Sequence, residues 1–207
     1  MKFSFAKLEQ PKNGVAVAFI ADDMKVKGLL AKMDKKNILP KAMKAAVGFK
    51  GKHGNCLSLL APEGMDLDKL IIISLGNKKD LDDNSLQALG GKLASKLNCF
   101  EIAKAKVVVE DMCGMFATDI ATNLAYGAKL RNYRFNQHYV EKKESKESKL
   151  KELTFLMKES AKKEFAEMEA FAKELDNIDS LEKWHSAYYT EKLKQKLFNL
   201  DDEKLKP

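Results

Sequence analysis

The sequence predicts an α/β domain, built as a mixed, mostly parallel sheet flanked by helices, followed by a C-terminal helical appendage. Three observations support this fold class. Apolar runs typical of strands recur between residues 2 and 157, and amphipathic segments with helical spacing lie between several of them. Residues 160–207 contain no glycine and are rich in Glu, Lys and aromatic side chains, which favours helix alone. We therefore place the domain at residues 1–158 and the helical segment at residues 159–207.

Six segments have the composition of strands. Residues 2–7 alternate apolar and polar side chains, as in a half-buried strand. Residues 14–20 and 70–75 are continuous apolar runs, which are typical of strands covered on both faces. The same reasoning predicts strands at residues 55–60, 103–109 and 150–157.

Three helices are predicted among these strands. Asp82, Asp83 and Asn84 can cap a helix over residues 85–97, in which four leucines share one face. A second helix is expected over residues 118–130, and a short one over residues 41–47. Beyond the domain, a charged link at residues 141–149 leads to amphipathic helices expected over residues 161–175 and 181–200.

The charge is uneven along the chain. The net charge is +7, but residues 1–143 hold 24 Lys and Arg against 15 Asp and Glu, whereas residues 144–207 hold 13 Lys against 15 Asp and Glu. A basic domain could bind nucleic acid, although a solvated lysine-rich surface is the simpler interpretation. Lysine outnumbers arginine 35 to 2, which argues against base readout.

No apolar stretch approaches the roughly 18 residues of a membrane span, and the first residues lack the apolar run of a secretory signal. A cytoplasmic protein with no membrane partner is the expectation. The three cysteines form no C-x-x-C pair, so neither a zinc knuckle nor a disulfide framework is expected.

Few residues suggest chemistry. The turn at Gly76 leads from the strongest strand toward a capped helix, where phosphate can bind, but the sequence fits neither a dinucleotide fingerprint nor a P-loop. Cys113 precedes a helix that could stabilise a thiolate, although a small buried hydrophobe is the simpler reading. None of the three histidines has a ligand at metal-binding spacing. No catalytic residue and no metal ligand is predicted.

One short segment is a candidate interface or anion contact: Arg131, Tyr133, Arg134 and Phe135. It holds both arginines of the chain and combines cations with aromatic rings, as interface patches often do. The alternative is a helix end whose aromatics pack and whose arginines cap carbonyl groups.

Three motifs in order carry a family resemblance: the strand and L-G turn at residues 70–76, L-G-G-K-L at residues 89–93, and Y-G-A-K-L-R-N-Y-R-F-N-Q-H-Y at residues 126–139. As a set they resemble the N-terminal domain of the leucyl aminopeptidase family, the cytosol aminopeptidases, over about residues 1–158. The resemblance implies a macro-like fold. In that family this domain precedes a catalytic domain, which holds two divalent metal ions, and helps to assemble an oligomer.

The tail resembles a different family. The motif W-x-x-A-Y-Y-x-E-K-L at residues 184–193 is similar to a segment of the thimet/oligopeptidase A metallopeptidases that lies upstream of their zinc helix. The two resemblances together suggest a fusion of truncated peptidase pieces. None of the leucyl aminopeptidase metal-binding positions occurs in this sequence, so no cofactor is expected here and the chain is predicted to be inactive alone.

We therefore expect a non-catalytic assembly or interaction domain that associates with itself or with leucyl aminopeptidase subunits. The alternative is a nucleic-acid-binding module that uses the basic domain. A third hypothesis is a small-molecule site at the carboxyl ends of the strands, where open α/β sheets often bind ligands.

Overall fold

The computed structural model describes residues 1–132, 148–159, 161, 163, 166–167 and 170. The chain divides into two compact units, Met1–Phe165 and Ala166–Pro207. The fold described below belongs to the first unit. The predicted link at residues 141–149 and the two predicted tail helices lie wholly or largely outside the described residues.

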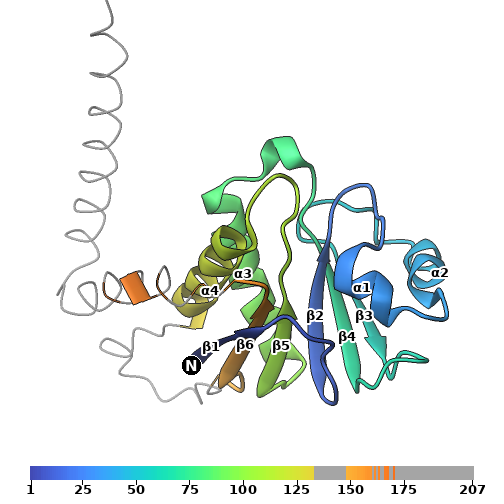
Figure 1. Ribbon diagram of the computed structural model, residues 1–207, viewed down its shortest axis with the longest axis horizontal. Coiled ribbons are helices and arrows are strands. Elements are labelled where there is room, and N and C mark those ends of the chain that lie inside the picture. The colour runs from blue at the N-terminus through green and yellow to red at the C-terminus, as the bar shows by residue number, and fades with distance from the viewer. Residues whose placement is uncertain (133–147, 160, 162, 164–165, 168–169, 171–207) are drawn as a thin grey trace, which may run out of the picture. The chain divides into compact units, whose positions relative to one another are not determined.

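A six-stranded sheet forms the centre of the first unit (Figure 1). Its strand order is β1 (Lys2–Lys7), β6 (Glu152–Met157), β5 (Lys104–Val108), β2 (Val15–Ile20), β4 (Lys69–Ser74) and β3 (Cys56–Leu60). All neighbouring strands pair in parallel except β3, which runs antiparallel to β4. The mixed, mostly parallel sheet expected from the sequence is confirmed, and so are all six strands.

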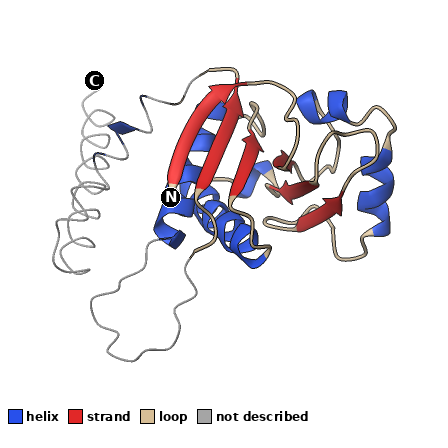
Figure 2. Ribbon diagram, turned by 90° about the horizontal axis from the view of Figure 1, so that it is seen from below, coloured by secondary structure: helices blue, strands red, loops and turns tan. Residues whose placement is uncertain are grey.

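Helices cover both faces of this sheet. Side chains alternate across a strand, and those of β2 and β4 divide between two core clusters. One cluster contains Val17, Phe19, Ile71 and Ile73 together with residues of α3 (Asp83–Cys99) and α4 (Ala117–Asn132). The other contains Ala16, Ala18, Leu70 and Ile72 together with residues of α1 (Gly28–Met33) and α2 (Ile38–Ala45). Burial on both faces explains the continuous apolar runs of β2 and β4, and Figure 2 shows the two groups of helices around the strands.

The helix capped by Asp82 is confirmed. The Asp82 carboxylate accepts the Ser85 N–H at 2.7 Å, the Ser85 hydroxyl accepts the Asp82 N–H at 2.9 Å, and α3 then runs for 17 residues. The helix predicted over residues 118–130 is α4. The short helix α2 begins at Ile38, three residues before the predicted start, because the Asp34 carboxylate accepts the N–H groups of Ile38 and Leu39.

The six-residue helix α1 was not predicted. Its N-cap residue is Lys27, whose side chain makes no capping hydrogen bond, and none of its first residues is acidic. Its cap comes instead from a carboxylate far along the chain, as described below. A local sequence pattern could not reveal such a helix.

Two glycines bring α3 and α4 into backbone contact. A Cβ atom at Gly90 would lie 2.1 Å from the carbonyl oxygen of Leu124, and one at Gly127 would lie 1.8 Å from the carbonyl oxygen of Gln87. At Gly91, the next residue of α3, the nearest atoms would be 3.6 Å away, an ordinary contact. The first glycine of L-G-G-K-L and the glycine of Y-G-A-K-L therefore make the close helix–helix contact.

A polar cluster completes the same contact. The Asn123 side chain accepts a hydrogen bond from Gln87 Nε2 at 2.9 Å and donates one to Asp83 Oδ1 at 3.1 Å. Asn123 is only 9% exposed, so these bonds satisfy a polar group that would be costly to bury alone. No helix among the described residues has the length and apolar character needed to cross a membrane.

Candidate functional site at the carboxyl ends of the strands

The carboxyl ends of β2, β4 and β5 meet at one edge of the sheet, because these strands are parallel. Open α/β sheets commonly bind ligands in the crevice outside this edge. A ligand site is therefore expected among the residues that follow the three strands. They include Asp22 and Asp23 after β2, Gly76 after β4 and Glu110 after β5.

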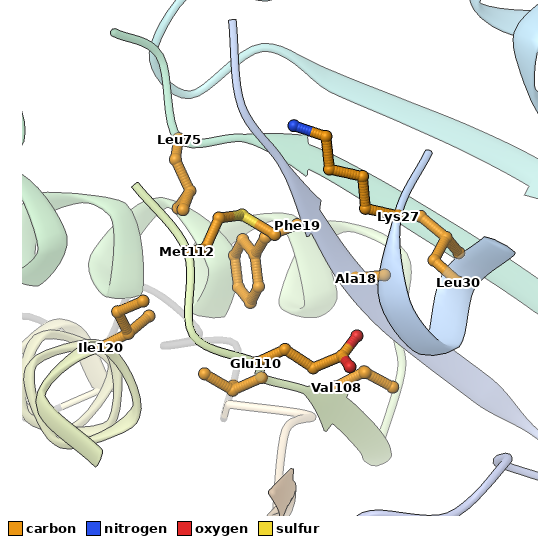
Figure 3. A pocket seen from close by; sticks show the side chains of 10 residues that line it. Ala18, Phe19, Lys27, Leu30, Leu75, Val108, Glu110, Met112 and Ile120 are labelled. Atoms are coloured by element: carbon orange, nitrogen blue, oxygen red, sulfur yellow. The ribbon is translucent and has the colours of Figure 1, made fainter. Parts of the chain in front are cut away.

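Glu110 fills the space at the start of α1. Its Oε2 accepts the Leu29 N–H at 2.8 Å, across 81 residues of sequence. Gly28 has φ +61°, and a Cβ atom there would lie 2.2 Å from the same carboxylate oxygen. Figure 3 shows the Glu110 side chain reaching from the end of β5 toward the start of α1, which carries Leu30, while the Lys27 ammonium points away from it. The carboxylate thus joins β5 to α1.

The cavity at this edge is small. Its volume is about 20 Å³, which accommodates roughly one water molecule. Apolar side chains make up most of its lining, from Ala18, Phe19, Leu30, Leu75, Val108, Val109, Met112 and Ile120, with Glu110 and Lys27 as its charged members. This cavity is too small for a ligand larger than water, whereas a more open hollow of about 460 Å³, lined by residues of α1, α2 and the loops around them, shares Lys27 with it.

The turn after β4 is closed by internal hydrogen bonds. The Gly76 N–H donates to Ser74 Oγ at 3.1 Å, and Ser74 Oγ donates to the Gly51 carbonyl at 2.7 Å. Gly76 has φ +80°, and a Cβ atom there would lie 2.8 Å from the Cβ of His53. His53 Nδ1 also lies 2.9 Å from the Leu75 carbonyl oxygen. The arrangement favours the tight structural turn over a phosphate-binding loop.

A carboxylate of the chain itself occupies the N-terminus of each of the four helices α1 to α4. Glu110 accepts a backbone N–H at the start of α1, Asp34 does so at α2 and Asp82 at α3. At α4, Asp111 Oδ1 accepts the Ala117 N–H at 2.8 Å. Exposed helix N-termini attract anions because their N–H groups and the helix dipole favour negative charge. Here the chain's own carboxylates already supply that negative charge, so a bound phosphate would have to displace one of them.

The pKa values of Asp23 and Cys113, near this cavity, are shifted in opposite directions. A hydrogen bond from the Lys27 ammonium at 2.8 Å lowers the pKa of Asp23, and one from the Lys25 backbone N–H lowers it further. Burial raises the pKa of the Cys113 thiol, and the carboxylates of Asp22 and Asp23 add to that effect. Cys113 is therefore held as a thiol, which argues against the reactive thiolate considered from the sequence.

Of the candidate interface residues, the structure describes only Arg131. It is exposed at the end of α4, one residue before that helix finishes. Tyr133, Arg134 and Phe135 lie outside the described residues, so whether the four form one patch stays a prediction.

Sequence reasoning did not identify Glu110 or Asp34 as capping residues. A usable signal existed for Asp34, which stands four residues before the first helical residue of α2. No comparable signal marks Glu110, apart from its place directly after a buried strand. In the described part of the chain, no group of three or more His, Cys, Asp or Glu side chains could hold a metal ion.

The model of the cytosol aminopeptidase family, N-terminal domain, matches residues 16–143. A probable cytosol aminopeptidase of Bradyrhizobium sp. (strain BTAi1 / ATCC BAA-1182) is 34% identical over 149 residues, which is 70% of this chain and 29% of the relative. One of Methylorubrum populi is 34% identical over 141 residues, which is 66% of this chain and 27% of the relative. The chain thus spans less than a third of the length of these curated relatives.

Solved structures agree on the fold. A mutant of tomato leucine aminopeptidase superposes with a TM-score of 0.59 at 23% identity, covering 83% of this chain and 36% of that one. The macrodomain of Mycobacterium tuberculosis DarG superposes with a TM-score of 0.53 at 9% identity, covering 75% of this chain and 97% of that one. The macro-like fold expected from the resemblance is confirmed.

The tail is not part of the family match, which stops at residue 143, and its resemblance to the oligopeptidases stays a prediction. The match itself covers more than half of the 207 residues. The chain therefore belongs to the cytosol aminopeptidase family and carries the family's N-terminal domain.

Proposed function

We propose that residues 1–158 act as a non-catalytic assembly or interaction domain of a cytosol aminopeptidase. The proposal rests on one observation: the chain's own side chains fill much of the edge at the carboxyl ends of the strands, where a ligand would be expected to bind. At this edge, carboxylates of the chain occupy the N-termini of α1, α3 and α4, and the cavity beside Glu110 holds about one water molecule. We infer that this edge supports the fold, and that the domain contributes through its outer surfaces.

The chemistry of the family supports the same proposal. Metal-assisted peptide hydrolysis uses bound ions to polarise the carbonyl group and to activate water. The matched model is that of the N-terminal domain, and the chain aligns with 29% of the length of its Bradyrhizobium relative. We expect the metal-binding residues in the part of the relatives that residues 16–143 do not match. The relatives are named for the cytosol, and we propose the cytoplasm as the location of this chain.

The partner we expect is another copy of this chain or a full-length leucyl aminopeptidase subunit. Size-exclusion chromatography with light scattering tests this directly, on the purified chain alone and mixed with the full-length enzyme of the same cell. A species heavier than either component alone is the expected result. Elution of the monomer in both runs would contradict the proposal.

Arg131 allows a finer test of the interface. Arg131→Gln is expected to weaken the association, whereas Lys92→Gln, which removes one exposed charge from α3, serves as the matched control. Equal behaviour of the two variants would exclude Arg131 as a contact and leave the association itself intact.

Activity provides the independent check. The purified chain, supplied with zinc or manganese, is expected to leave leucyl-anilide uncleaved. Metal-dependent turnover well above that of a heat-denatured sample would show that the domain is catalytic after all.

A further inference from the structure

The sheet ends in two edge strands, β1 and β3, and the two edges differ in charge. β1 has an exposed lysine at each end, Lys2 and Lys7, and charges of this kind keep natural sheet edges from pairing with other chains. β3 has the sequence C-L-S-L-L, without a charged residue or a proline. Figure 1 shows β3 at the end of the sheet, beyond β4. The β3 edge therefore lacks these protections.

Alternate peptide groups of β3 point away from the sheet. The Ala61 N–H donates to the Asp68 carbonyl at 2.8 Å, and the Ser74 N–H donates to the Asn55 carbonyl at 2.9 Å. These bonds mark hydrogen-bonded positions of the antiparallel pair with β4, and such positions recur at every second residue. The residues whose peptide groups face away from β4 are Cys56, Ser58 and Leu60. In the described part of the chain, only β4 pairs with β3.

The side chains of this edge are mostly apolar and partly open to solvent. Leu60 is 73% exposed, and the other four residues of β3 are half-buried. Cys56 packs on the core beneath α3 and α4, whereas Leu57 and Leu59 pack on the core beneath α1 and α2. An edge that combines outward-facing peptide groups with apolar side chains is a template for another strand.

We propose that β3 pairs with β3 of a second copy of this chain, antiparallel and about a two-fold axis. The inference rests on the proposed assembly function, and it specifies the surface through which two copies associate. All five residues of β3 are paired only when the middle residue, Ser58, faces Ser58 of the second copy. Cys56 then faces Leu60 of the second copy, which covers the exposed leucine. The two sheets become one continuous sheet with a symmetric interface.

The charges on either side of β3 favour this self-pairing. Residues 48–55, before the strand, contain two lysines and no carboxylate, whereas residues 61–68, after it, contain three carboxylates and no lysine. All five charged side chains are exposed: Lys50, Lys52, Glu63, Asp66 and Asp68. One of them, Glu63, also pairs with Lys36 of its own chain. In an antiparallel pair the start of one strand lies beside the end of the other, so a basic flank meets an acidic flank at both ends.

The same arrangement is unfavourable at the other edge. Antiparallel self-pairing of all six residues of β1 would place Lys2 opposite Lys7 at both ends, and facing like charges destabilise a strand pair. A strand of an unrelated protein would gain the same backbone hydrogen bonds at β3, but without the matched flanks. A second copy of this chain is therefore the better fit for β3.

Ser58 offers the sharpest test, because the two-fold axis places it opposite itself. Ser58→Lys sets two ammonium groups face to face, and Ser58→Glu sets two carboxylates, so each variant alone should associate about threefold to tenfold more weakly. An equimolar mixture of the two should associate at least as tightly as the wild-type chain, because opposite charges then face each other. Ser4→Lys, on the β1 edge, is the matched control and should leave the association unchanged. Sedimentation equilibrium measures the dissociation constant in each case.

A disulfide tests the register independently. Leu60 and Cys56 of the second copy would occupy a hydrogen-bonded position, where Cα atoms lie about 5.5 Å apart, a separation that a disulfide can span. The other two cysteines, Cys99 and Cys113, are free thiols and are replaced by serine. In that background, Leu60→Cys should give a covalent dimer on mild oxidation, and adding Cys56→Ser should abolish it. A gel run without reducing agent separates the two species.

The outcomes distinguish this pairing from the assembly function on which it rests. Circular dichroism verifies that each variant stays folded. Three results would overturn the pairing and leave assembly intact: wild-type association that both Ser58 variants retain, a mixture that associates no better than either variant, or an associated Leu60→Cys chain without the disulfide. Binding of the chain to full-length aminopeptidase without self-association would overturn it as well. A chain that stays monomeric alone and with that enzyme would contradict both.

Discussion

The two helical layers of the sheet are held in different ways. In the α3–α4 layer, two helices of 17 and 16 residues meet backbone to backbone at Gly90 and Gly127. In the α1–α2 layer, the helices have 6 and 8 residues, and carboxylates from outside them cap their N-termini. Both layers bury apolar side chains against the sheet, but only the α3–α4 layer adds a close backbone contact between its helices.

The two layers also differ in surface charge. Residues 25–52, which form α1, α2 and the loops around them, hold nine lysines and one carboxylate, whereas the remainder of the described domain is close to neutral. Tight packing tolerates few changes, and repulsion between like charges costs stability. The comparison teaches that close helix–helix packing and an excess of lysine lie on opposite faces of the sheet in this domain. The predictions below test that division, from the largest expected effect to the smallest.

The glycine contact should be the most sensitive part of the molecule. Gly127→Ala would bring a methyl group within 1.8 Å of the Gln87 carbonyl oxygen, so α3 and α4 must move apart. We expect a loss of about 3 kcal/mol in the free energy of unfolding, since overpacking of this severity typically costs that much. Denaturant titration followed by circular dichroism measures the loss.

Gly91→Ala is the matched control for the same helix. Its nearest contacts would be 3.6 Å away, and alanine has the higher helix propensity, so stability should be unchanged or rise by up to about 1 kcal/mol. If Gly91→Ala and Gly127→Ala destabilised the protein equally, the α3–α4 layer would not owe its stability to this close contact.

The cap on α1 should be the next most sensitive. Gly28→Ala places a methyl group 2.2 Å from Glu110 Oε2 and demands φ +61° of alanine. A loss of about 2 kcal/mol is expected from the clash and the backbone strain together. Gly48→Ala is the control, because a Cβ atom there meets nothing within 4 Å.

A second substitution separates the two causes. Glu110→Ala in the Gly28→Ala background removes the clash but not the strain, so part of the lost stability should return. If the double variant were less stable than Gly28→Ala alone by the full cost of a lost hydrogen bond, about 1 kcal/mol, the clash would be the minor cause.

The ion pair between Asp23 and Lys27 should matter least, because both groups are solvent-exposed. The pKa of Asp23 is lowered in the folded state, chiefly by the hydrogen bond from Lys27. The pair therefore stabilises the fold above the ordinary aspartate pKa of about 4, and this contribution disappears as the pH falls through the lowered value.

Asp23→Asn should accordingly be slightly less stable than the wild-type chain near neutral pH and equally stable in strong acid. Thermal unfolding at several pH values and two salt concentrations measures the difference. A difference that grew toward low pH would have the wrong sign and would exclude this pair as its cause.

The strands and the two long helices could be predicted from the sequence. Burial on both faces requires uninterrupted apolar runs at β2 and β4, and the capping residues of α3 are its sequence neighbours. These signals are local, so each can be read without knowledge of the fold. The lysine-rich composition was equally plain, but the pairing of Lys36 with Glu63, 27 residues further along, was not.

Only the tertiary structure decided the rest. Glu110 caps α1 across 81 residues, and no local pattern can carry that pairing. Gly90 and Gly91 are adjacent and identical in the sequence, yet only Gly90 faces the Leu124 carbonyl, because neighbouring residues of a helix point in directions about 100° apart. Propensity and periodicity act over a few residues, whereas caps and close contacts depend on which elements the folded chain brings together.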